Sequence, residues 1–199
     1  MALAIIGQDS IRDFAEGNKR ARMCDVFYDA TRTYLLGQFN WPFARRTARL
    51  SMLAESPDWV PEGIYPYALP VDCVNVVDLL PEGSRQTWEI RGNILYCAYG
   101  ADFEVVILYS REVEDATKFS APFSSLLAVA LAVRLAPPLT QDKTLTRAIF
   151  EQFEIEKKEA WATDANVGNR LVQNDNDPNT DTFVQAEPCC TDGNQRYPA

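Results

Sequence analysis

Apolar side chains recur at helical spacing from residue 11 to residue 35. Ile11, Phe14 and Ala15 begin a pattern with steps of three, four and seven residues, which is typical of an amphipathic helix. Asp9 and Ser10 precede it and are suitable N-cap residues. The polar side of this predicted helix carries five basic residues, which form either a solvated face or a partner-binding stripe. They are Arg12, Lys19, Arg20, Arg22 and Arg32.

A short aromatic stretch follows the helical pattern. Proline at position 42 disfavours helical geometry for Trp41 and has no amide hydrogen to donate, so the helix is expected to end close to this point. The aromatic rings can bury enough apolar area to fasten the helix to the next element. We therefore predict a structural joint made by Phe39, Trp41, Pro42 and Phe43.

The pattern then changes to strands. Apolar and polar residues alternate near residues 47–52, and β-branched residues are frequent at 74–80, so each segment is predicted to be a strand. Between them lie a loop at 56–63 and an aromatic segment at 65–70 that prolines stiffen. Gly92 and Asn93 form a two-residue turn suited to a hairpin. Further strands are predicted at 87–91, 94–98 and 103–109, and strands joined so closely in sequence favour an antiparallel meander.

Two more helices are predicted after the strands. Ser120 and Pro122 suit a helix start, residues 123–136 are apolar on nearly every side, and Pro137–Pro138 is expected to end that helix. Thr140 or Asp142 opens another helix to about residue 165. The predicted class is α+β, in which a long N-terminal helix and a C-terminal helical hairpin surround a central meander. We expect one domain at 1–168 and an extended tail at 169–199, ordered mainly on a partner.

Composition narrows the possible functions. The chain of 199 residues has no histidine, which excludes Ser-His-Asp and Cys-His constellations, and its net charge of −9 argues against a broad face for gripping phosphate backbones. Its five cysteines show no CxxC spacing, so a disulfide framework is not indicated. No apolar run reaches the roughly 20 residues that span a bilayer. We expect a soluble, intracellularly made protein with no membrane partner.

Candidate chemistry is sparse. Asp175, Asp177, Asn179 and Asp181 alternate like the first ligands of a calcium loop, but Thr180 and Ala186 replace the glycine and glutamate that such a loop needs. A solvated acidic tail is the favoured interpretation. No glycine-rich phosphate motif is present. No catalytic residue, metal site or cofactor is predicted, and most aromatic residues are assigned to the core, with Tyr65–Tyr67 as the favoured contact segment.

The order of short motifs resembles a known family. Trp41-Pro42-Phe43-Ala44 follows the first long helix, Tyr67-Ala68-Leu69-Pro70-Val71-Asp72 precedes the next strand, and a later helix ends at Leu135-Ala136-Pro137. This order is similar to that of the tail tubular protein A family, the head-to-tail adaptors of tailed bacteriophages. The resemblance covers roughly residues 8–168.

The resemblance implies a structural protein of the virion neck. Adaptor subunits form a ring, usually of twelve copies, between the portal protein and the tail nozzle, and viral DNA passes through the ring. An acidic channel would repel DNA rather than hold it. The resemblance implies ring or tail contacts at Trp59, Tyr65, Tyr67, Arg91 and Asn93. It implies portal contacts in the C-terminal segment, at Asn174, Asp177, Phe183, Val184 and Tyr197.

Two other hypotheses remain open at this point. One is a different virion part, such as a head-completion or tail-terminator subunit. The other is a soluble α+β enzyme or ligand-binding domain, which predicts a deep pocket with saturable small-molecule binding.

Overall fold

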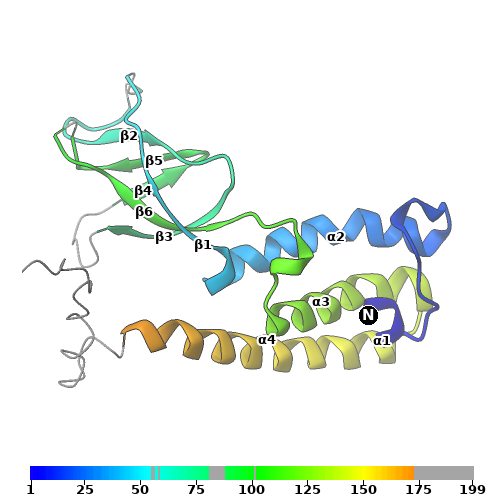
Figure 1. Cartoon of the computed structure of the whole chain (residues 1–199). Helices are drawn as coiled ribbons and strands as arrows, with labels where there is room; N and C mark the ends of the chain where they lie inside the picture. The colour runs from blue at the N-terminus through cyan, green and yellow to red at the C-terminus, as the bar shows by residue number, and fades with distance from the viewer. Residues whose placement is uncertain (55–56, 58, 81–87, 101, 173–199) are drawn as a thin grey trace, which may run out of the picture.

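The computed structural model describes residues 1–54, 57, 59–80, 88–100 and 102–172, with side-chain surroundings up to residue 165. Over these residues the protein is a mixed α+β chain with four α-helices and two three-stranded antiparallel sheets. The three long helices lie side by side, and the sheets lie beyond one end of α2 (Figure 1). The α-helices are α1 (Ala2–Ile5), α2 (Lys19–Gln38), α3 (Ala121–Thr140) and α4 (Lys143–Val172).

The start of α2 differs from the sequence-based prediction. Asp9 and Ser10 do not cap it; the N-cap is Asn18, whose side chain accepts a hydrogen bond from the Ala21 amide at 2.8 Å. Gly17 precedes it at φ 68°, a left-handed conformation that interrupts helical geometry. Of the upstream apolar residues in the predicted pattern, Phe14 and Ala15 lie in a short 3-10 helix, η1 (Phe14–Glu16), and Ile11 lies outside any helix.

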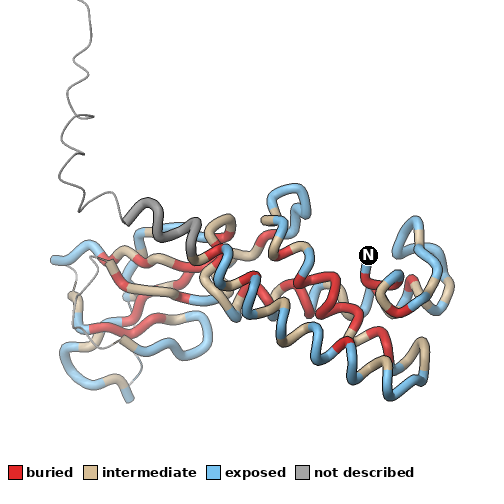
Figure 2. Tube along the Cα trace, turned by 90° about the horizontal axis from the view of Figure 1, so that it is seen from below, coloured by how far each residue is buried: buried red, intermediate tan, exposed pale blue. Residues whose placement is uncertain are grey.

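Helix α3 is the central element of the helical part. It contacts α1, α2 and α4, and most of its apolar side chains are buried (Figure 2). By length and composition it could cross a membrane, but this packing identifies it as a core helix. Ser120 caps it as predicted, with its hydroxyl accepting from the Phe123 amide. The prediction that Pro137–Pro138 ends the helix is wrong, since α3 continues to Thr140 and stops where Gln141 turns to φ 56°.

The strands form two sheets rather than one sequential meander. The first sheet has the order β1-β6-β3 and the second β2-β5-β4. The hairpin of β4 and β5 around Gly92 is confirmed, and Gly92 adopts φ 61°. The aromatic segment at 65–70, for which no strand was predicted, contains strand β2. The strand bounds are β1 (Arg45–Arg49), β2 (Tyr65–Ala68), β3 (Cys73–Leu80), β4 (Trp88–Arg91), β5 (Ile94–Cys97) and β6 (Val106–Arg111).

Long-range pairing explains why the meander prediction was wrong. β6 lies between β1 and β3, which are far from it in sequence. Beyond β1 the chain leaves β6, and Met52 forms a bridge opposite Tyr67, so one segment borders both sheets. Buried side chains from both sheets, including Leu95 and Ile107, pack in one cluster. This shared core fixes the two sheets against each other.

Helix α4 passes the predicted domain boundary at residue 168 and ends at Val172. Its C-terminal end lies on the side of the sheets, whereas the turn between α3 and α4 lies at the far end of the helices (Figure 1). The predicted calcium-like pattern, the portal contacts and Cys189–Cys190 all lie in 173–199, outside the described residues.

Candidate functional site

The predicted joint is an aromatic cluster between α2, α3 and the 3-10 helix η2 (Pro42–Ala44). Trp41 is fully buried, and its indole nitrogen donates to the Leu35 carbonyl at 2.8 Å. The rings of Phe39 and Phe123 meet the Trp41 ring edge-on, with centroids 5.2 and 5.0 Å away. Phe43 lies against Phe123, at 5.1 Å. The cluster has no exposed reactive group, so its contribution is packing.

A more accessible site lies on the outer face of the second sheet. Residues of β4 and β5 line a cleft of about 310 Å³ together with the segment near residue 60. Trp59 covers Tyr96 with its ring centroid 5.1 Å away, and the Arg91 guanidinium lies 4.0 Å from the Trp59 ring centroid. Trp59 and Arg91 were both predicted as contact residues. They are 32 positions apart in sequence, and the fold brings them together in one site.

The two charged side chains that line this cleft, Arg91 and Glu89, form an ion pair with each other. Arg91 donates from two nitrogens to the two carboxylate oxygens of Glu89, at 2.8 and 3.2 Å. This hydrogen bonding lowers the pKa of Glu89, so its carboxylate stays ionised and is a poor general base near neutral pH. The indole and the carboxylate hold the guanidinium in a fixed orientation. Such an arrangement suits recognition of a partner's surface better than proton transfer.

The other predicted contact residues have different surroundings. Tyr65 is half-exposed and covers Gly100, where an added Cβ would lie 3.2 Å from the tyrosine ring. Asn93 is exposed in the hairpin turn. Tyr67 is buried, and its hydroxyl donates to the Tyr99 carbonyl at 2.8 Å. The prediction that Tyr67 makes an external contact is therefore wrong, because its side chain is buried in the core cluster shared by the two sheets.

Two buried charges were not predicted, and both have structural partners. Arg32, expected on the polar side of the helix, is buried and forms ion pairs with Asp29 at 2.8 Å and Glu112 at 3.0 Å. It therefore ties α2 to the segment after β6. Asp164 on α4 accepts from the Ser120 hydroxyl at 3.0 Å, beside the amino end of α3. That end favours a negative charge, which explains how a buried carboxylate is tolerated.

Metal ligation has no candidate in the part of the chain that the structure describes, because no three Cys, Asp or Glu side chains converge there. Among the same residues the cysteines Cys24, Cys73 and Cys97 are free thiols. Burial raises the pKa of each thiol, which disfavours the reactive thiolate.

Comparison with known proteins does not extend these observations. No model of a known protein family matches the chain, and no curated protein is similar to it at a significant level.

Proposed function

We propose that the chain is a structural subunit of the bacteriophage virion neck, a head-to-tail adaptor similar to the tail tubular protein A family. The observation that carries the proposal is the placement of the two motifs that resemble this family. Trp41-Pro42-Phe43-Ala44 makes the joint from helix to sheet, and Tyr67–Asp72 makes a strand and the turn after it. Both motifs thus have folding roles, as expected of motifs shared by a structural family.

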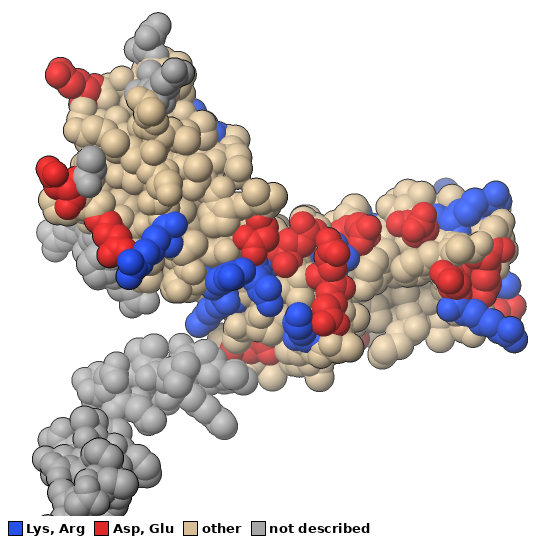
Figure 3. Space-filling model, turned by 45° about the horizontal axis from the view of Figure 1, so that its top comes forward, with Lys and Arg blue, Asp and Glu red and all other residues tan. Residues whose placement is uncertain are grey.

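The surface is compatible with this role. Side chains of both signs are spread over the helices and the junction, whereas the sheets expose mostly uncharged side chains on the face shown (Figure 3). The net charge of −9 would let DNA pass through a ring without adhering to it. In this proposal the helices and sheets form one adaptor domain, and copies assemble into a ring, usually of twelve, between portal and nozzle.

The cleft around Trp59 and Arg91 is then a contact surface on the sheet side. Its aromatic faces and its orientated guanidinium belong to residue types that dominate protein interfaces. We assign this surface to the ring or the tail nozzle.

Electron microscopy of the purified chain mixed with its portal protein tests the proposal. We expect a ring of density below the portal vertex. Absence of rings and of portal decoration under all assembly conditions would contradict an adaptor role. Pull-down from infected cells separates the related possibilities, because an adaptor recovers the portal protein, whereas a tail-terminator subunit recovers the tail-tube protein.

A further inference from the structure

An apolar groove lies at the turn between α3 and α4, at the end of the helices far from the sheets. It encloses about 590 Å³, and Val133, Pro137 and Phe150 form its apolar walls. The Phe150 side chain is 51% exposed, which is high for a large aromatic residue. Val133 also packs against the helical core cluster, whereas Pro137 and Phe150 belong to none of the core clusters.

Cations surround the groove. Lys143 and Arg147 line it, and the Lys19 ammonium donates to the Pro138 carbonyl at 2.7 Å beside it. The carboxylate of Asp142 also lines the groove, but it accepts hydrogen bonds from the first amides of α4, at 2.8 and 3.1 Å. Arg147 pairs with Glu151 on the exposed helix surface, where such a pair is weak. The groove therefore favours an apolar side chain flanked by carboxylates.

The same chain presents such a side chain elsewhere. Val71 is fully exposed in the turn after β2, which is closed by a hydrogen bond from the Cys73 amide to the Pro70 carbonyl at 3.0 Å. Around it lie the carboxylates of Asp72, Glu112 and Glu114 and one guanidinium, that of Arg46. Asp72 pairs with Arg46 at 3.5 Å and Glu112 with Arg32 at 3.0 Å, whereas Glu114 forms no ion pair among the described residues. Val71 is thus an apolar projection beside the carboxylate of Glu114.

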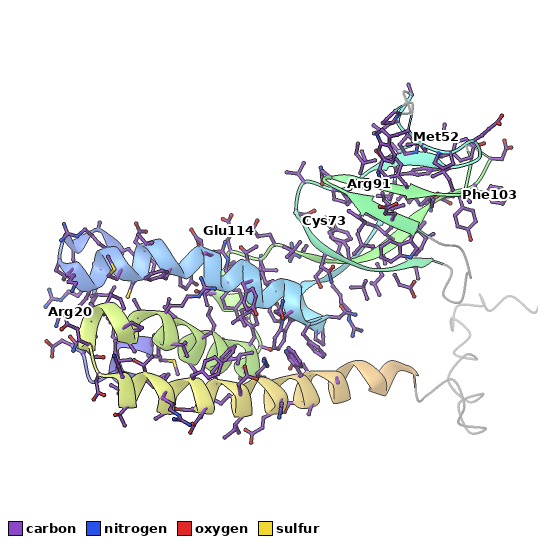
Figure 4. The ribbon with its side chains drawn as sticks, turned by 180° about the vertical axis from the view of Figure 1, so that it is seen from behind. Arg20, Met52, Cys73, Arg91, Phe103 and Glu114 are labelled. Atoms are coloured by element: carbon purple, nitrogen blue, oxygen red, sulfur yellow. The ribbon has the colours of Figure 1, made fainter. Side chains whose placement is uncertain are left out.

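The two surfaces lie at different places on the molecule. Glu114 lies on the outer side of α2, towards the sheets, whereas Arg20 marks the far end of the helices (Figure 4). The groove is at that far end, at the turn between α3 and α4. Because the two surfaces are separate, a contact between them uses a different patch on each copy and can continue from one copy to the next.

We propose that Val71 of one copy inserts into the α3–α4 groove of the next copy, with Glu114 facing Lys143. The occupant is a second copy of this chain because the apolar features match and the charges are opposite. This contact specifies the ring interface and, as a ring contact, rests on the proposed function. Each contact can be weak, since ring closure adds a second contact to every subunit.

Two substitutions test the contact by sedimentation. Val71→Lys places a cation against the basic rim, and Phe150→Glu places an anion in the groove against Glu114. Each variant alone is expected to self-associate at least about tenfold more weakly than the wild type. Val26→Lys is the matched control because Val26 is also exposed, on α2. It is expected to assemble like the wild type.

A mixture of the two variants gives the sharper result. Val71→Lys keeps an intact groove and Phe150→Glu keeps an intact projection, so the mixture is expected to associate more strongly than either variant alone. In the mixture the lysine introduced at position 71 of one variant also faces the glutamate introduced at position 150 of the other, so the opposite charges do not block the second contact. A mixture that remains monomeric would overturn the head-to-tail geometry. Unaltered circular dichroism and melting of each variant show that folding is not the cause.

A charge exchange adds an independent test. Glu114→Lys and Lys143→Glu are each expected to weaken assembly, and the double variant is expected to recover most of it, because every interface then regains opposite charges. The inference is wrong if the wild type stays monomeric up to about 1 mM, if either variant of Val71 or Phe150 assembles normally, or if the double variant does not recover.

The outcomes also separate this inference from the adaptor proposal. Portal-bound rings that are unaffected by Val71→Lys and Phe150→Glu would leave the adaptor role intact and refute the contact. Head-to-tail self-association without portal binding would support the contact and refute the adaptor role.

Discussion

Trp41 shows how one side chain can hold two kinds of secondary structure together. Its ring fills the space between the end of α2 and the start of α3, and its indole N–H is bonded to a carbonyl near the end of α2. A buried indole would otherwise leave an unpaired donor, at a cost of about 1 to 3 kcal/mol. The same residue thus contributes apolar burial and satisfies a backbone group.

Trp41→Ala is expected to lower the free energy of unfolding by about 3 to 5 kcal/mol, because truncation leaves a cavity among packed aromatic rings. Urea unfolding followed by circular dichroism measures this. Trp59→Ala is the control, since Trp59 is half-exposed, and we expect it to cost about 1 kcal/mol or less. Normal stability of Trp41→Ala together with lost portal binding would identify Trp41 as an interface residue instead.

At the scale of elements, capping side chains mark where the three long helices begin. Asn18, Ser120 and Asp142 each accept a hydrogen bond from a backbone amide in the first turn of a long helix. Ser120 and Asp142 were predicted from sequence as helix starts, but Asn18 was not. Of the apolar residues with helical spacing upstream of Gly17, only Phe14 and Ala15 are helical, in the short helix η1.

Asn18→Ala is therefore expected to destabilise the protein by about 1 kcal/mol, since the Ala21 amide loses its side-chain partner. Ser10→Ala is the matched control and should change the unfolding free energy by less than about 0.5 kcal/mol. Equal effects of the two substitutions would indicate that the helix begins near Ser10 after all.

At the scale of the whole molecule, the C-terminal end of α4 and the α3–α4 turn lie at opposite ends of a helix of 30 residues. At 1.5 Å per residue this separation is about 45 Å. The tail after Val172 thus begins on the side of the sheets, while the groove that we assign to a neighbouring copy lies at the other end.

Removal of residues 173–199 is expected to leave the unfolding midpoint unchanged but to abolish portal binding. The hydrophobic clusters of the described residues lie before residue 165, and the tail is mostly polar. Thermal melting and portal co-sedimentation measure the two effects. A full-length chain with a scrambled tail separates the role of the tail sequence from that of its composition. A truncated chain that still binds the portal would refute the predicted tail contacts.

Much of the local structure followed from the sequence alone. The change from helical spacing to alternation located the strand region, Gly92–Asn93 marked a hairpin, and Ser120 marked a helix start, because turns and caps depend on a few neighbouring residues. The positions of Trp59 and Arg91 as surface residues were also predictable. Their contact was not, because nothing local specifies which distant loop covers a strand.

Only the tertiary structure decided how these pieces combine. It placed β6 between β1 and β3, turned Tyr67 inward, and buried Arg32 against Glu112. Each outcome depends on contacts between residues that are far apart in sequence, either apolar side chains that pack together or opposite charges that pair. The spacing of residues along the chain therefore carries little information about these contacts. The sequence by itself determined the α+β class and the joint at Trp41, and packing decided the two-sheet topology and the surfaces left for partners.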